Sequence, residues 1–148
     1  MVNLFWTSFS NENFYLYIIK MSDIHDYSTG KIYMIICNVT GLRYVGSTKV
    51  PLKSRLYRHE TDYRGYMGLL NKPRNYRGSA ECIINGDYNM YLLQDYPCET
   101  RKQLEHQESK WMLFMSQYYN LTNKCMPTMI TFEDFKEIES FKIPSLRC

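Results

Sequence analysis

Two apolar runs joined by a short polar turn constrain the fold of this chain more than any other feature. Lys31–Cys37 is a run of strand-forming residues, residues 38–41 read Asn-Val-Thr-Gly, and 42–47 return as a second strand. This pattern predicts an antiparallel hairpin. If 38 and 41 close the turn, Tyr44 lies opposite Ile35. The register decides which side chains share a face, and a one-residue bulge would break that prediction.

The predicted hairpin brings two phenols together on one face of the sheet. Side chains alternate along a strand, so Tyr33 shares the face of Ile35, and Tyr44 stands diagonally across from Tyr33. Paired aromatic residues on a sheet usually belong to a hydrophobic core, and this interpretation stays open beside a functional one.

A basic helix is predicted directly after the hairpin. Pro51 suits its first position, and Leu52 and Leu56 form its inner side. Arg55 and His59 are four residues apart and therefore share a face, one turn from each other. Arginine can bind a phosphate with two hydrogen bonds, and histidine exchanges protons near neutral pH. On spacing alone, an ordinary solvated face is the alternative.

A carboxylate interrupts the apolar side of a longer predicted helix. Thr100 and Gln103 form a capping box, which predicts a helix of about 18 residues. Its apolar positions are Leu104, Trp111, Met115 and Tyr118. Glu108 lies on this side, where a carboxylate costs several kcal/mol unless it is paired or binds a metal. It either serves a functional site or pairs with a core arginine at the rim, whereas Glu105 is predicted to face solvent.

The remaining segments complete the predicted fold. Two more strands are expected at about 80–85 and 89–95, and a last helix at 132–140. Residues 62–78 contain glycine and proline among tyrosine and arginine, and they are predicted to form a loop with at most one short helix. The result is an α/β (α+β) fold with a small central antiparallel sheet of three to four strands flanked by helices.

Charge is distributed unevenly along the chain. The formal net charge is +3, but residues 43–77 contain nine lysine or arginine residues and only two acidic ones. Such a segment indicates a polyanionic partner, although a plain solvated loop is the alternative for 62–79. Besides Arg55, the basic residues of this segment are Arg43, Lys49, Lys53, Arg58, Arg64, Lys72, Arg74 and Arg77.

Cysteine usage and hydropathy limit the compartment. The five cysteines are irregularly spaced and include no CxxC pair, so free thiols in a reducing, intracellular compartment are expected: cytoplasm or nucleus of a host cell, not a secreted protein. No uncharged apolar run approaches the ~18 residues of a membrane span. Residues 1–20 are rich in apolar and aromatic side chains. They are interpreted as a packed arm or an upstream extension before Met21, with a peripheral membrane anchor as a further hypothesis.

Five motifs then occur in a characteristic order. They are Lys31-Ile32-Tyr33, Tyr44-Val45-Gly46, the Arg55–His59 pair, the helix around Glu108, and the segment 119–124 with Asn123. Together, over residues 30–124, they resemble the GIY-YIG nuclease superfamily. Lys31 replaces the first glycine of the signature, Val45 replaces isoleucine, and 62–79 has the appearance of an insertion. Residues 125–148 are too short for a separate DNA-recognition module.

The resemblance implies a domain layout and an activity. Residues 1–29 form an N-terminal extension, 30–124 the nuclease domain, and 125–148 a C-terminal extension within the same globule. The implied activity is metal-dependent DNA endonuclease of homing, restriction or repair type, which hydrolyses phosphodiester bonds. A catalytically inactive nucleic-acid-binding module on the same fold is the alternative. DNA is the implied partner, no membrane partner is expected, and a homodimer is one route to double-strand cleavage.

The resemblance also implies roles for individual residues. Its catalytic residues are Tyr33, Tyr44, Arg55, His59, Glu108 and Asn123. Glu108 holds one Mg²⁺ or Mn²⁺ ion per active site, which a single carboxylate can do because Mg²⁺ keeps several waters. One of the two tyrosines activates water, through a lowered pKa or through a relay with His59. Arg55 neutralises charge on the phosphate, Asn123 fixes the site geometry, and the other basic residues of 43–77 contact DNA.

Overall fold

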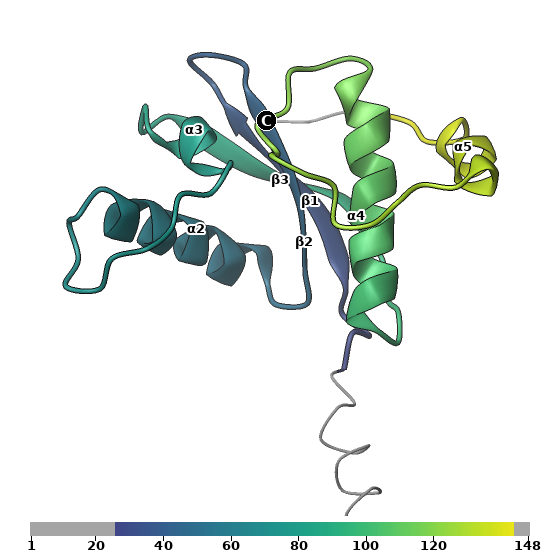
Figure 1. Cartoon of the computed structure of the whole chain (residues 1–148), viewed down its shortest axis with the longest axis horizontal. Helices are drawn as coiled ribbons and strands as arrows, with labels where there is room; N and C mark the ends of the chain where they lie inside the picture. The colour runs from purple at the N-terminus through teal and green to yellow at the C-terminus, as the bar shows by residue number, and fades with distance from the viewer. Residues whose placement is uncertain (1–25, 144–148) are drawn as a thin grey trace, which may run out of the picture.

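The structure is a computed structural model that describes residues 26–143 of the 148-residue chain. Within this range three antiparallel strands form one sheet in the order β2-β1-β3. The strands are β1 (Lys31–Cys37), β2 (Arg43–Thr48) and β3 (Tyr88–Asp95). The helices are α2 (Leu52–Tyr66), α3 (Ala80–Ile83), α4 (Arg101–Ser116) and α5 (Phe132–Ile138). The predicted α+β fold, a small antiparallel sheet flanked by helices, is confirmed (Figure 1).

The predictions for residues 1–20 fall outside the described residues. None of the helices described in the structure is sufficiently long and apolar to span a bilayer.

The β1–β2 hairpin has the predicted register. Ile35 lies opposite Tyr44, and the pairing runs without a bulge from end to end. Gly41 closes the turn with a φ of 72°, a value that glycine adopts without strain. A register shift occurs instead between β1 and β3, where Leu93 is the extra residue. The shift lies away from β2, so it leaves the two tyrosines on one face.

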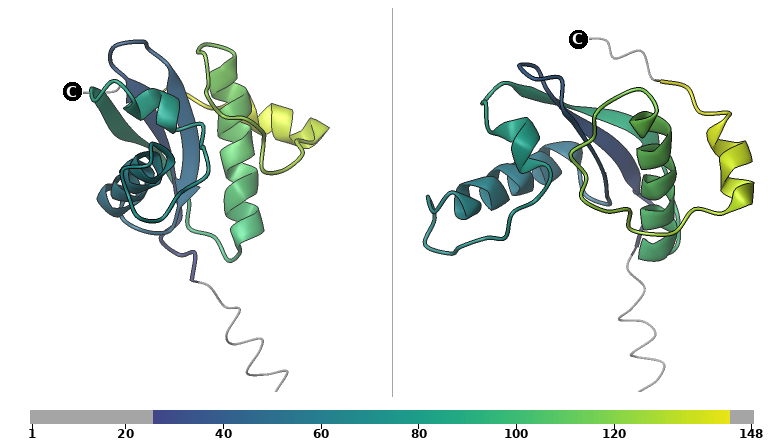
Figure 2. Two further views of the ribbon diagram at one scale, coloured as in Figure 1. Left: turned by 60° about the vertical axis from the view of Figure 1, so that its left-hand side comes forward. Right: turned by 45° about the horizontal axis from the view of Figure 1, so that its top comes forward.

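Helices cover both faces of the sheet (Figure 2). On one face, Ile32, Met34 and Val45 pack against α4, and α5 lies on the outer side of that helix. On the other face, Tyr33 and Ile35 belong to a second cluster beneath α2 and α3. β1 is therefore buried on both sides, whereas β2 and β3 are the edges of the sheet.

Two predicted segments were wrong in detail. Residues 80–83, expected in a strand, form the helical turn α3, because a short apolar run does not distinguish a strand from a helix. The basic helix also continues past residue 62 to Tyr66. Gly65 permits this continuation because the Arg74 side chain packs where a Cβ would stand. The loop after α2 consequently folds back onto the helix.

Candidate active site

A cavity of about 370 Å³ lies at the end of β2 and brings the central motif residues together. Tyr44 comes from β2, Arg55 from α2 and Glu108 from α4. The cavity is also lined by Tyr27, Ser47, Thr48, Lys49, Arg58, Arg101, Leu104 and Glu105. Because β2 is an edge strand, side chains from both faces of the sheet reach the same opening.

Glu108 presents its carboxylate to this cavity from α4. Ser47 Oγ donates a hydrogen bond of 2.5 Å to Glu108 Oε2. Ser47 reaches α4 because it shares the strand face of Val45, which packs against that helix. Burial raises the pKa of Glu108, while the Ser47 bond and the charge of Arg55 act in the opposite direction.

The donors of the cavity fit a hydrated divalent cation. Within residues 26–143 there is no group of three histidine, cysteine or acidic residues that could hold a metal. A partly buried carboxylate beside open volume nevertheless suits Mg²⁺, which retains waters and requires few protein ligands. Glu108 is therefore the residue that would anchor such an ion.

Tyr33 lies behind the cavity and is completely buried. Its hydroxyl accepts a 2.9 Å hydrogen bond from Arg55 Nε and lies 2.7 Å from His59 Nε2. Gly46 makes room for this hydroxyl, since a Cβ at that position would collide with it. Tyr33 is therefore held on two sides and is not among the residues that line the opening.

Tyr44 is the phenol that faces the cavity. It is partly buried, and its ring packs edge-on against His59 at 5.4 Å between centroids. Burial raises the pKa of both Tyr33 and Tyr44, and the charge of Glu108 adds to the effect. Neither phenol therefore has the lowered pKa that was one predicted route to water activation.

His59 is a neutral, buried member of the site. Only 2% of the residue is exposed, and Nδ1 lies 2.8 Å from Ser79 Oγ. Burial lowers its pKa to about 3, and the nearby charges of Arg55 and Arg77 contribute. His59 contacts Tyr33 and Ser79 but does not line the cavity.

Asn123 holds the outer edge of β2 without reaching the cavity. Its Oδ1 accepts the Val45 N–H at 3.0 Å, and its Nδ2 donates to the Val45 carbonyl at 2.7 Å. One residue earlier, the Thr122 N–H donates to the Arg43 carbonyl at 2.7 Å. The side-chain amide therefore continues the pairing that the backbone of residues 120–122 begins.

The basic residues predicted to contact DNA occupy three kinds of environment. Lys49 and Arg58 line the cavity, and Lys53, Arg64 and Lys72 are solvent-exposed on α2 or just after it. Arg74 and Arg77 pair with Asp62 at 3.7 and 3.0 Å. Arg43 instead stacks on Tyr119, with its guanidinium carbon 3.3 Å from the ring centroid.

Sequence reasoning missed several residues of the site. Glu105, predicted to face solvent, is partly buried at the cavity wall and is bound to Arg101 at 2.7 Å. The prediction was wrong because the cavity curves around α4 beyond the buried stripe. Strand alternation could have identified Ser47, whereas no local pattern marks Ser79.

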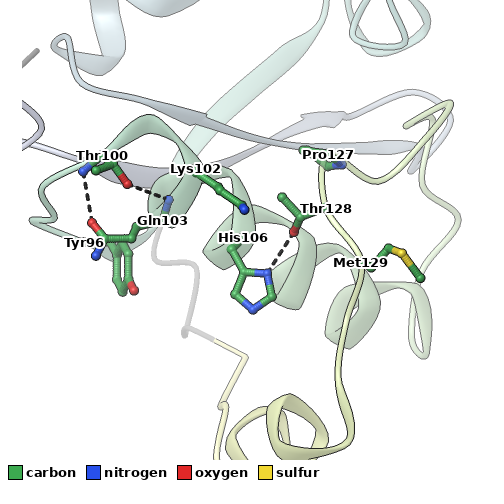
Figure 3. A pocket seen from close by; sticks show the side chains of 8 residues that line it. All are labelled: Tyr96, Thr100, Lys102, Gln103, His106, Pro127, Thr128 and Met129. Atoms are coloured by element: carbon green, nitrogen blue, oxygen red, sulfur yellow. Dashed lines mark hydrogen bonds between the residues drawn. The ribbon is translucent and has the colours of Figure 1, made fainter. Parts of the chain in front are cut away.

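The largest cavity of the described residues lies elsewhere (Figure 3). It measures about 650 Å³, is lined in part by Tyr96, Lys102 and His106, and contains none of the motif side chains. His106 is occupied there by Thr128, 2.9 Å from Nδ1, and by Asp134, 3.0 Å from Nε2. These bonds fasten residues 128–134 to α4.

Comparison with known proteins establishes the family. The sequence model of the GIY-YIG catalytic domain matches residues 29–135, so the chain belongs to the GIY-YIG family. No curated protein and no solved structure gives a significant match. Membership implies a nuclease with DNA as its substrate.

Proposed function

We propose that the protein is a metal-dependent DNA endonuclease that hydrolyses phosphodiester bonds in the cavity at the end of β2. The observation that carries the proposal is the meeting of Glu108, Arg55 and Tyr44, from three different elements, around one opening. A carboxylate, a guanidinium and a phenol are the groups needed to anchor a cation, bind a phosphate and orient water. Residues 30–124 carry this chemistry, and 125–143 support α4 from outside.

Glu108 would hold one Mg²⁺ or Mn²⁺ ion. When bound, the ion supplies Lewis-acid stabilisation of charge on the scissile phosphate and the leaving oxygen. Ser47 keeps the carboxylate turned toward the opening through its hydrogen bond to Oε2. Ser47 thereby restricts the rotamers of a side chain that burial alone would drive toward its protonated form.

Arg55 would bind the phosphate. Its Nε is already used by the Tyr33 hydroxyl, so the two terminal nitrogens are left to make paired hydrogen bonds to phosphate oxygens. The Tyr33 bond also reduces the rotational freedom of the guanidinium before substrate arrives. Arg55 is therefore prepared to stabilise the charge that grows on the phosphate in the transition state.

Tyr44 would orient the attacking water. It is the only one of the two motif tyrosines to line the cavity, and its hydroxyl makes no hydrogen bond to any other residue of 26–143. A phenol whose pKa is raised stays protonated, so Tyr44 accepts a hydrogen bond from water through its oxygen. Tyr33, by contrast, acts through Arg55 and is a positioning residue.

The exposed basic residues would hold the DNA duplex beside the cavity. Lys49 and Arg58 lie at its wall, and Lys53 is exposed on the same helix as Arg58. Contacts of this kind bind phosphates without reading sequence and weaken with salt. One active centre cuts one strand at each encounter, so a second copy of the chain would be needed to cut both strands together.

The cysteines are compatible with an intracellular setting. Cys37, Cys82, Cys98 and Cys125, the cysteines of the described residues, are all free thiols. Free thiols suit the reducing cytoplasm or nucleus in which we propose that the enzyme meets DNA.

Incubation with supercoiled plasmid tests the proposed function. The full chain should nick plasmid with Mg²⁺ or Mn²⁺, and EDTA or Arg55→Ala should abolish nicking. Lys136→Ala on α5 is the matched control, because it removes a cation outside the site and should cut normally. Plasmid that is shifted in gels but never cut with either metal would instead identify an inactive DNA-binding module.

A further inference from the structure

We infer that Ser79 is a positioning residue of the proposed nuclease site. It ends a one-way chain of hydrogen bonds, Arg55–Tyr33–His59–Ser79, that fixes which nitrogen of His59 carries the proton and holds Arg55 at the cavity. The inference rests on the proposed function for its catalytic consequence. The hydrogen-bond chain itself consists of side chains whose mutual distances are already defined.

The position of Ser79 is set by packing. Ser79 is 2% exposed and stands at the N-cap of α3, which packs against both α2 and β1. Just before it, Gly78 lies so close to the Thr122 carbonyl that a Cβ would collide with it. The main chain at 78–79 is therefore confined, and the Ser79 hydroxyl is directed to His59 Nδ1 at 2.8 Å.

The direction of the first hydrogen bond follows from chemistry. An arginine Nε can only donate, so the Tyr33 oxygen is the acceptor at 2.9 Å. Tyr33 is completely buried, and its own hydrogen must therefore find an acceptor within the protein. His59 Nε2, at 2.7 Å, is the atom placed to accept it.

The direction continues through the imidazole to Ser79. Nε2 accepts and so carries no hydrogen, and a neutral imidazole then has its single N–H on Nδ1. This N–H donates to Ser79 Oγ. Every member of the chain has one role, and none can reverse without leaving a buried donor or acceptor unpaired.

Loss of the Ser79 hydroxyl would release this constraint. The buried Nδ1–H would have no partner, which favours the other tautomer, with the hydrogen on Nε2. Two hydrogens would then point at each other between His59 and Tyr33. Tyr33 would have to turn its hydroxyl away, and Arg55 would lose the acceptor that holds its Nε.

Two measurements on the full chain test the inference. The first is ¹⁵N NMR of the His59 ring without DNA or metal, assigned by comparison with His59→Gln. We expect a protonated Nδ1 and an unprotonated Nε2 in the wild type, and a shift toward Nε2–H in Ser79→Ala. A protonated Nε2 in the wild type would overturn the inference, whether or not the protein cuts DNA.

The second measurement is plasmid nicking. Ser79→Ala should lower kcat by about tenfold to a hundredfold, as loss of a supporting hydrogen-bond partner does, with little change in KM for DNA. Ser79→Thr keeps the hydroxyl and should recover most of kcat. Ser109→Ala, which removes another fully buried serine hydroxyl, is the matched control for stability and should nick normally.

The outcomes of the two measurements separate the hypotheses. If kcat of Ser79→Ala equals that of the wild type, Ser79 has no positioning role. If Ser79→Ala and Ser109→Ala lose equal stability and equal activity, the serine is merely structural. A wild type that never cuts DNA would refute the proposed function and leave the NMR result to decide the hydrogen-bond chain.

Discussion

Tyr33 and Tyr44 look equivalent in the sequence, yet their hydroxyls have different surroundings. That of Tyr33 is buried between Arg55 and His59, and that of Tyr44 opens into the cavity. Strand alternation predicted that the two rings share a face, and the register confirms it. Which hydroxyl reaches the cavity depends on α2, packed over the first ring, and could not be derived from the hairpin alone.

Removing each hydroxyl should therefore have different effects. Tyr33→Phe leaves a buried Arg55 Nε and a buried His59 Nε2 without partners, so it should lower the free energy of unfolding by about 1–3 kcal/mol and slow nicking. Tyr44→Phe should slow nicking while changing stability by less than about 0.5 kcal/mol. Urea denaturation and plasmid nicking of both variants are the measurements. Equal losses of stability would contradict the assignment.

His59 should make the fold sensitive to acid. Its pKa is about 3 in the folded chain and 6.5 when unperturbed, so the unfolded state binds more protons between these values. The free energy of unfolding should therefore be largest above about pH 6.5 and fall as pH drops toward 3. Urea denaturation at a series of pH values measures this slope, and His59→Gln should flatten it. Identical slopes for the two proteins would refute a neutral His59.

At the scale of elements, α4 and β2 form the site because Asn123 and Ser47 join them. Asn123 binds Val45 on β2 and lies 3.6 Å from Met112 Sδ on α4 through its Nδ2. The capping box at Thr100 and Gln103, which the sequence predicted, begins α4 where expected. The helix ends at Ser116, however, and leaves Tyr118, predicted in the apolar stripe, 56% exposed.

Asn123→Ala tests the role of the β2 edge. It removes two hydrogen bonds to the Val45 backbone, so we expect a loss of about 1–3 kcal/mol in the free energy of unfolding. Affinity for Mn²⁺, measured by calorimetry on the folded variant, should change little because Asn123 does not line the cavity. A variant with unchanged stability and no Mn²⁺ binding would place Asn123 at the ion instead.

Local patterns predicted the elements whose neighbours in sequence decide their structure. The hairpin and the capped helix are of this kind. The helical turn of α3 is not, because residues 80–83 are helical only through burial of Ala80, Cys82 and Ile83. The roles of Ser79 and Glu105 likewise depend on contacts that form after the elements have packed.

At the scale of the molecule, positive charge is concentrated on α2 and the segment that follows it. The sequence predicted this concentration, but the structure divides its members. Lys53 and Arg58 are exposed, whereas Arg43 lies over the Tyr119 ring, with Nε and Nη1 buried. Only the exposed cations are free to approach DNA phosphates.

Salt dependence of DNA binding should distinguish these groups. Loss of one phosphate contact lowers the slope of log affinity against log salt concentration by about 0.9. Lys53→Gln and Arg58→Gln should each reduce the slope by about this amount, measured by fluorescence anisotropy with duplex DNA and Ca²⁺ to avoid cleavage. Arg43→Gln is the control and should leave the slope unaltered. An equal reduction by all three would show that charge acts without regard to position.

The comparison of Glu108→Gln with Glu105→Gln tests the central assignment most directly. Both side chains line the same cavity from one helix, and both substitutions remove one negative charge. In Mg²⁺-dependent plasmid nicking, Glu108→Gln should be slower than wild type by about a hundredfold or more, because the anchor of the cation is lost. Glu105→Gln should retain most of the activity. Wild-type nicking by Glu108→Gln, or equal loss in both variants, would contradict the assignment.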